Sequence, residues 1–144
     1  MARQLTQHEI AELLCSDSVL YLATIDHHGY PHITPLWFLW DGEAIFATSK
    51  IGAPHLDRLA ANPRVGLLVD QEDAERPDGE RPNRQFRAVA DAEVVSDSGG
   101  HWTAEITRKY IRGDGRDTRA QLRAAQQRMA LKLVPRQVVA LSSV

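Results

Sequence analysis

The sequence predicts a mainly β domain with short helices, in which about six antiparallel strands close into a barrel. Short segments rich in β-branched and aromatic residues alternate with turn residues along most of the chain. Most of these segments are joined by tight turns, so the pattern is not the alternating βαβ pattern of a parallel sheet. Antiparallel strands in this number tend to close and so remove their exposed edges. At 144 residues, the chain is expected to form one domain over 1–144.

The composition is that of a soluble globular protein. Apolar residues make up 43% and charged residues 25%, and the formal net charge is −2. This balance gives no global attraction to nucleic acid or to an anionic membrane. The first ten residues lack an apolar signal core and no segment is long enough to span a bilayer, so a cytoplasmic location is expected. The single cysteine, Cys15, excludes an intramolecular disulfide and falls in an apolar helical pattern, so we expect it to pack in the core.

The first elements are a helix and a strand. Thr6 and Glu9 have the spacing of a capping box, and the apolar residues that follow it line one helical face. Residues 18–25 are β-branched and aromatic and predict a strand, which Asp26 and Gly29 end in a turn.

The next strand is unusual because it contains two prolines. Residues 31–40 form a nearly unbroken apolar run, yet Pro31 and Pro35 lie inside it, and proline cannot donate to a strand ladder. The Asp-Gly pair at 41–42 is a strong signal for a tight turn, so 31–40 and 43–49 are predicted to form a β-hairpin.

The second half alternates helices with longer strands. Gly52, Ala53 and Pro54 open a helix, with Pro54 at a first-turn position that tolerates proline. The remaining predicted elements are a helix end at 62–63, a strand at 64–70, a surface loop at 71–83, a long strand at 84–95, a helix ending at Gly113, a second helical piece at 117–129 and a closing strand over 130–144.

The histidines and glycines do not form a recognised catalytic or metal motif. His27, His28 and His32 lack the helical spacing of a zinc site and have no nearby pair of carboxylates or thiolates. We therefore expect the first two to be solvated and predict no metal site. The sequence has no Walker motif, no dinucleotide fingerprint and no Gly-x-Ser-x-Gly elbow.

A cationic cluster near the second helix suggests an anion site. Lys50 precedes the helix start at Gly52, and a helix N-terminus directs free N–H groups at an anion. Arg58, Arg84 and Arg87 are candidates to converge on the same place. The alternative is a solvated basic rim.

The order of three blocks resembles the pyridoxamine 5′-phosphate oxidase-like family, the split-barrel flavin superfamily that also contains deazaflavin-dependent reductases. The blocks are "VLYLATIDHHGYPHITPLWFLWDGEAIFATS", "LAANPRVGLLVD" and "RQFRAVADAEVV", and the likeness covers about residues 5 to 112. The resemblance implies a six-stranded antiparallel split β-barrel that forms a homodimer, with two flavin sites in the subunit interface.

The resemblance also implies which residues bind the cofactor. The flavin would lie along the main chain of the strand at 32–36. Trp37 is a candidate wall of the pocket, although on general grounds a position in the core is the stronger expectation for a tryptophan. The prolines would then mark where this strand turns its backbone toward a flat ligand. A glutamine in the family approaches the ring, and Gln85 matches it. The implied cofactor-binding residues are His32, Ile33, Thr34, Pro35, Leu36, Ala47, Thr48, Ser49, Lys50, His55, Arg58, Gln85 and Arg87.

The chain departs from the family at the phosphate clamp. A Ser-Arg-Lys-like clamp is common there, whereas this chain has Ala53, Pro54 and His55. Histidine is a weaker, pH-dependent cation, and proline removes one N–H donor. The expected cofactor is FMN, with a deazaflavin coenzyme as the alternative because its longer anionic tail could reach Arg58 or the 71–83 loop.

The resemblance predicts a flavin- or deazaflavin-dependent oxidoreductase acting on a small molecule, and no residue stands out as its catalytic acid or base. One alternative is a non-enzymatic haem or tetrapyrrole-binding protein on the same fold, with His27, His28, His32 or His55 as axial ligand. The other is a dimerisation module without activity, which the altered clamp supports.

Overall fold

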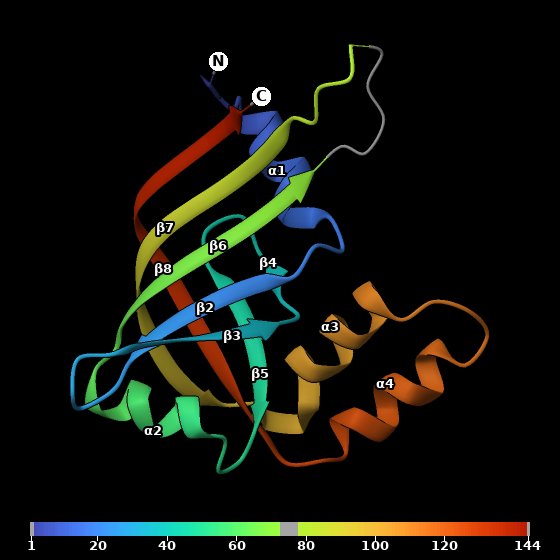
Figure 1. Ribbon diagram of the computed structural model, residues 1–144. Helices are drawn as coiled ribbons and strands as arrows, with labels where there is room; N and C mark the ends of the chain where they lie inside the picture. Colours follow the sequence, from blue (N-terminus) through green and yellow to red (C-terminus); the bar gives the residue numbers. More distant parts are fainter. Residues whose placement is uncertain (1, 73–77, 144) are drawn as a thin grey trace.

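The computed structural model describes residues 2–72 and 78–143, and its centre is a curled antiparallel sheet flanked by short helices (Figure 1). The strands are β1 (Arg3–Gln4), β2 (Leu20–Ile25), β3 (Pro31–Leu36), β4 (Leu39–Trp40), β5 (Ile45–Lys50), β6 (Arg64–Glu72), β7 (Asn83–Ser96) and β8 (Arg128–Ser143). The helices are α1 (Gln7–Cys15), α2 (Pro54–Ala61), α3 (His101–Tyr110) and α4 (Arg116–Ala124), and a 3-10 turn (Ser98–Gly100) precedes α3.

The strand order is β3-β2-β6-β7-β8-β5-β4, with β1 added beside β8. The described part of the chain therefore holds eight strands, although β1 and β4 have only two residues each. All of the pairings are antiparallel. The predicted class, mainly β with short helices and a curled antiparallel sheet, is confirmed, and Figure 1 shows the long strands β7 and β8 bending around the curl.

The core lies on the inner face of the curled sheet. Along β2, Leu20, Leu22 and Thr24 are fully buried, while Tyr21 between them is exposed on the outer face. Helix α1 adds Leu13 and Leu14 to the core. This alternation is the period-two pattern of a sheet with one covered face.

Helix α3 covers part of the opposite, outer face. Phe46 of β5 is directed away from the barrel interior, and its ring stacks on Trp102 of α3 at 3.9 Å. Helix α4 packs against α3 and extends this cover (Figure 1). Helices α1 and α2 contact β2, β6 and β7 on the core side, where Leu59 of α2 is buried. On the outer face of these strands and of β3, the side chains of Tyr21, Ile33 and Val89 are exposed.

The predicted hairpin between 31–40 and 43–49 is confirmed only at its turn end, where Leu39–Trp40 pair with β5, because the proline-bearing segment is two strands. Residues Pro31–Leu36 pair with β2, whereas Leu39–Trp40 pair with β5. The break falls where Phe38 turns into the core and becomes fully buried. Tyr110 and Lys109 of α3 satisfy its backbone: Phe38 N–H donates to Tyr110 Oη (3.3 Å), and Lys109 Nζ donates to the carbonyl oxygen of Phe38 (2.9 Å).

The two prolines lie on an edge strand, where their missing donors are tolerated. Among the residues that the structure describes, β3 is the last strand of the sheet and pairs only with β2, with Pro31 opposite Ile25 and Pro35 opposite Tyr21. In an antiparallel ladder, a proline fits only where its N–H would point away from the partner strand. The prolines therefore occupy outward-facing positions of the free edge.

Three smaller predictions also need correction. Helix α4 ends at Ala124, and β8 begins at Arg128, before the predicted start at 130. Cys15 is exposed, because it follows Leu14 by about 100° around the helix and leaves the buried stripe. The predicted loop at 71–83 is shorter, since Glu72 and Asn83 belong to β6 and β7; residues 73–77 lie outside the described ranges. No helix in those ranges is long and apolar enough to cross a membrane.

Candidate functional site

A cavity of about 360 Å³ lies where the end of β3 approaches β5. The β3 side supplies Pro35, Leu36 and Trp37, and β5 supplies Thr48. These two strands are far apart in the order of the sheet, so the curl of the sheet brings them to one place. Because Pro35 and Leu36 belong to a free edge, the cavity opens beside a strand whose outer positions are not used by another strand.

Helices α3 and α4 form the other wall of this cavity, which we call the β3–β5 cavity. Helix α3 contributes Thr103, Ile106 and Thr107, which lie on one helical face. Arg123 at the end of α4 and Arg128 at the start of β8 complete the lining. The cavity thus combines an apolar side, three hydroxyl-bearing threonines and two guanidinium groups.

Trp37 is fixed by aromatic stacking. Its ring lies parallel to that of Tyr110, with 4.9 Å between centroids and an angle of 2°. The guanidinium of Arg123 lies 5.0 Å from the Trp37 centroid, within the range of a cation–π contact. Tyr110 is anchored in turn, because its hydroxyl donates to the carbonyl oxygen of Ser18 (2.8 Å), and burial raises the pKa of Tyr110 to about 12.

Arg128 is anchored to β5. Its Nε donates to Thr48 Oγ1 (3.3 Å) and its Nη2 donates to the Thr48 carbonyl oxygen (3.2 Å). Burial lowers the pKa of Arg128, and the positive charge of Arg123 adds to that effect. Two cations therefore lie in one partly buried place, with Thr48 fixing the orientation of one of them.

The start of α2 does not present His55 to solvent. His55 is buried, and its Nε2 lies 2.6 Å from the hydroxyl of Ser49, which is also buried. Burial lowers the pKa of His55, and Arg58 contributes to the same shift, so the neutral imidazole is favoured. Lys50 is exposed at the end of β5, and Arg58 Nε donates to Thr24 Oγ1 (2.8 Å).

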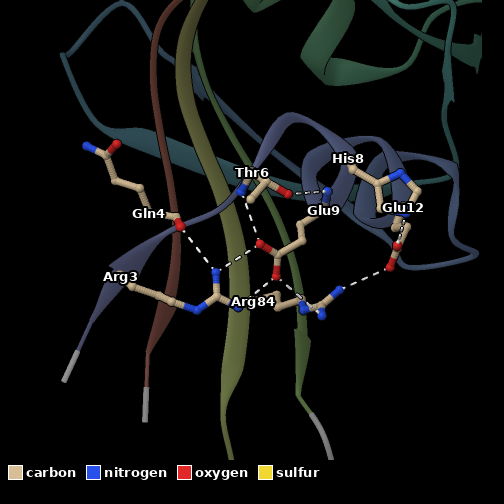
Figure 2. Close-up of polar contacts among 7 residues, drawn as sticks. All are labelled: Arg3, Gln4, Thr6, His8, Glu9, Glu12 and Arg84. Carbon is tan, nitrogen blue, oxygen red and sulfur yellow. Dashed lines mark hydrogen bonds and ion pairs between the residues drawn. The ribbon is translucent and has the colours of Figure 1, made fainter.

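Arg84 lies far from this helix start, contrary to the predicted convergence. Figure 2 shows its guanidinium between Glu9 and Glu12 of α1, at 3.4 Å and 3.3 Å. The end of β7 that lies near α2 can be located from Ala92. Its N–H donates to the carbonyl oxygen of Pro63, which lies two residues after the last residue of α2. At about 3.3 Å per residue, Arg84 is roughly 25 Å from that point along the strand.

Arg87 does not join the cluster either. It lies on the uncovered outer face of the sheet and lines a hollow of about 520 Å³ together with Tyr21, Ile33 and Asp70. Gln85, two residues before it on the same face, donates from Nε2 to Asn83 Oδ1 (2.9 Å). In the sheet, β2 and β6 separate both residues from β3, and β8 separates them from β5.

The remaining predicted residues have separate surroundings. His32 Nε2 lies 2.8 Å from Asp26 Oδ2. This hydrogen bond, together with bonds from backbone N–H groups to the same carboxylate, lowers the pKa of Asp26 to about 2. Thr34 is half-buried on β3, whereas Ala47 is fully buried on the inner face of β5.

His27 and His28 are exposed as expected, with ring centroids 3.9 Å apart. Across residues 2–72 and 78–143, no three histidine, cysteine or acidic side chains are grouped as metal ligands.

The structure thus gathers only part of the predicted set in the cavity. Pro35, Leu36 and Thr48 meet there, with the candidate wall Trp37. The other candidates lie at the start of α2, elsewhere on β3, on the inner face of β5 or on the outer face of β7. Sequence reasoning missed the α3 threonines, Arg123 and Arg128. The spacing of Thr103, Ile106 and Thr107 is a helical i, i+3, i+4 pattern, and two threonines on one buried face were the available signal.

Comparison with known proteins identifies relatives of this fold. The pyridoxamine 5′-phosphate oxidase family matches residues 6–142. A conserved hypothetical protein of Mycobacterium tuberculosis, Rv2991, is 24% identical with a TM-score of 0.75, over 94% of this chain and 84% of that one. An F420 reductase is 23% identical with a TM-score of 0.67, over 88% and 93%. HutZ, the heme storage protein of Vibrio cholerae, is 26% identical with a TM-score of 0.67, over 93% and 94%.

Proposed function

The chain belongs to the pyridoxamine 5′-phosphate oxidase family, and from this premise we propose that it is a flavin- or deazaflavin-dependent oxidoreductase that binds the cofactor ring at the β3–β5 cavity. The observation that carries the proposal is the meeting of Pro35 and Leu36 with Thr48 in one cavity. All three are cofactor-binding positions by resemblance, and they come from strands at separate places in the sheet.

The cavity suits the ring better than the helix start suits a phosphate. Its volume of about 360 Å³ is within the usual range for small-molecule sites, and its β3 side is apolar. At the start of α2, Pro54 supplies no N–H and His55 is turned inward. Asp57 in the first turn also opposes an anion. Lys50 is the cation left exposed there, and FMN and a deazaflavin coenzyme therefore remain competing proposals.

In this proposal, the cofactor would supply the hydride chemistry when bound, and the protein would bind the ring and shield it from water. The edge of β3 offers main-chain groups to the ring, while Ile106 of α3 excludes water from the other side. Thr48 has a hydroxyl at the cavity, held in place by Arg128. No described side chain is assigned as proton donor, so proton exchange runs through solvent or the cofactor.

We also propose that the protein is a homodimer, formed through the uncovered outer face of β2, β3, β6 and β7. Apolar side chains are exposed on this face, with Ile33 at 70%, Val89 at 50% and Tyr21 at 40%. An apolar sheet face of this kind favours burial against a partner. Sedimentation of the wild type as a dimer and of Ile33→Glu as a monomer supports the proposal, and a monomeric wild type contradicts it.

The cofactor proposal is tested by titration with FMN and, separately, with reduced deazaflavin coenzyme, followed by fluorescence quenching. Leu36→Trp fills the cavity and is expected to raise the Kd for the cofactor at least about tenfold. Leu122→Trp is the matched control, because Leu122 is exposed on α4 away from the lining. If neither cofactor binds the wild type with a Kd below roughly 100 µM, the oxidoreductase proposal fails.

Haem binding is the second candidate, favoured by the likeness to the heme storage protein. His32 and His55 are the axial candidates of most interest, since His32 is on β3 and His55 is the buried histidine. A Soret band on haem addition that disappears in His32→Ala or His55→Ala, without flavin binding, favours this alternative.

A further inference from the structure

The β3–β5 cavity holds two positive charges without a matching acid. Neither Arg123 nor Arg128 forms an ion pair with any carboxylate in residues 2–72 and 78–143. Elsewhere the same helices use arginine differently, as Arg108 of α3 pairs with Glu105 and Asp117. Guanidinium groups that line a cavity are usually paired or coordinate an anion, since an unpaired charge loses favourable solvation there.

The donors of Arg128 are only partly used. Nε and Nη2 are held by Thr48, while Nη1 donates to no residue that the structure describes. The guanidinium of Arg123 makes no hydrogen bond within the described ranges and lies over Trp37 instead. The mutual repulsion of the two guanidinium groups contributes to the lowered pKa of Arg128. An anion between them would relieve this repulsion and accept the free donors.

The nearest acid does not fulfil this role. Asp97 is close enough to act on the pKa of Arg128, but its carboxylate is taken by the start of α3. It accepts from the backbone N–H groups of Trp102 (2.9 Å) and Thr103 (3.1 Å) and from the Thr103 hydroxyl. Asp97 therefore caps a helix and leaves the two arginines available.

We propose that Arg123 and Arg128 bind the carboxylate or phosphate group of the small molecule that exchanges hydride with the cofactor. Because the proposed function places the cofactor ring against Pro35, Leu36 and Ile106, the body of this molecule lies on the ring itself, beside the two arginines of the lining. The role as redox partner rests on the proposed function above, whereas anion binding by the two arginines does not.

The experiment uses the wild-type chain and a matched pair of probes, benzoate and its neutral counterpart benzamide, titrated by calorimetry. Benzoate is expected to bind at least about tenfold more tightly than benzamide, because only the carboxylate forms charge-assisted hydrogen bonds. Arg123→Gln and Arg128→Gln are each expected to raise the Kd for benzoate about tenfold or more and to leave the Kd for benzamide unchanged.

Two further variants separate the site from general charge and folding effects. Arg119→Gln removes an exposed arginine from α4, outside the cavity, and is expected to bind benzoate like the wild type. Arg128→Lys keeps the charge but not the planar geometry, and its affinity for benzoate is expected to fall between those of the wild type and Arg128→Gln. Unchanged thermal unfolding of the variants shows that binding, rather than folding, is altered.

The inference is overturned if the wild type binds benzoate and benzamide with equal affinity. It is also overturned if Arg119→Gln loses as much affinity for benzoate as Arg123→Gln and Arg128→Gln do. FMN and reduced deazaflavin coenzyme are titrated into the same variants to identify the source of the anion. If Arg123→Gln and Arg128→Gln lose as much affinity for the cofactor as for benzoate, the arginines hold the cofactor's own phosphate, and the substrate assignment is overturned. If benzoate binds through the arginines but no cofactor binds the wild type, the proposed function fails while the anion site stands.

Discussion

Helix α1 and the helix pair α3–α4 are attached to the same sheet by different forces. Helix α1 buries Leu13 and Leu14 and is fixed on its exposed side by charges, since Arg3 and Arg84 both contact Glu9 (Figure 2). The α3–α4 pair is held by aromatic stacking, by Lys109 and by a close approach of the two helices at Gly100.

The difference shows how to separate structural arginines from candidate binding arginines. At α1, each guanidinium has a carboxylate, so the charges neutralise one another and leave no capacity for a ligand. At α3–α4, attachment to the sheet uses aromatic stacking and Lys109 bonds to backbone carbonyls, and the ion pair between the helices is taken by Arg108 and Asp117. Arg123 and Arg128 therefore remain without ion-paired acids among the described residues. The following four predictions test this contrast, from the largest expected effect to the smallest.

Gly100→Ala is expected to disturb the α3–α4 pair most. A Cβ at this position would lie 2.6 Å from the Cα of Ala124, and the φ of 69° is unfavourable for any other residue. We expect a loss of about 3 kcal/mol in the free energy of unfolding, measured with urea. Gly99→Ala has a similar φ but open space, so it should cost about 1 kcal/mol; equal losses would contradict the close-approach argument.

Lys109→Met tests the anchor of α3. Lys109 Nζ donates to the carbonyl oxygens of Phe38 (2.9 Å) and Leu14 (3.3 Å), and it lies 3.7 Å from the Phe38 ring centroid. Burial lowers the pKa of Lys109 to about 8. Methionine removes both donors, so a loss of about 2 kcal/mol is expected in urea unfolding. Arg112→Met, at an exposed position, is the control; a comparable loss there would show that the anchor is not specific.

Thr6→Ala tests the attachment of α1. Thr6 Oγ1 accepts from the Glu9 N–H and Glu9 Oε1 accepts from the Thr6 N–H, both at 3.1 Å, which completes the predicted capping box. Loss of the capping hydroxyl is expected to cost about 1 kcal/mol. Thr6→Ser keeps the hydroxyl and should unfold nearly as the wild type does, and a full loss in this variant would rule out the cap as the cause.

The pH dependence of stability tests the charges around α1. The hydrogen bond from Arg3, together with that from the Thr6 backbone, lowers the pKa of Glu9 to about 2 from its usual 4.5. Because the folded pKa is the lower one, the contribution is full above about 4.5 and is lost as the pH falls toward 2. The difference in urea midpoint between wild type and Glu9→Gln should therefore shrink below that pH. A difference in urea midpoint that stays constant from pH 7 to 3 would contradict a stabilising role of the Glu9 carboxylate.

Local signals in the sequence were enough for the elements that depend on neighbouring residues. Thr6 and Glu9 predicted the start of α1, and the β-branched and aromatic residues of 18–25 predicted β2. The predicted hairpin formed only over Leu39–Trp40, because Phe38 before it is stabilised by Lys109 and Tyr110, about seventy residues away in the chain. No local pattern reports such a contact, so the break between β3 and β4 was outside the reach of the sequence.

The candidate site divides in the same way. Pro35, Leu36 and Thr48 were accessible through a resemblance that covers the strands. Arg123 and Arg128 lie in the less distinctive C-terminal third, and their shared cavity depends on how α4 packs against α3. The predicted convergence of Arg84 failed because α1 supplies two acids beside it, and a list of cations does not show which of them are already neutralised.

The prolines of β3 have a consequence for how copies of this protein can associate. A free strand edge is a template for unlimited edge-to-edge polymerisation, and the outward N–H groups are the donors that a foreign strand would need. Pro31 and Pro35 remove two of these donors and leave that of Ile33 between them. The edge can therefore remain open beside the cavity without acting as a seed for fibrils.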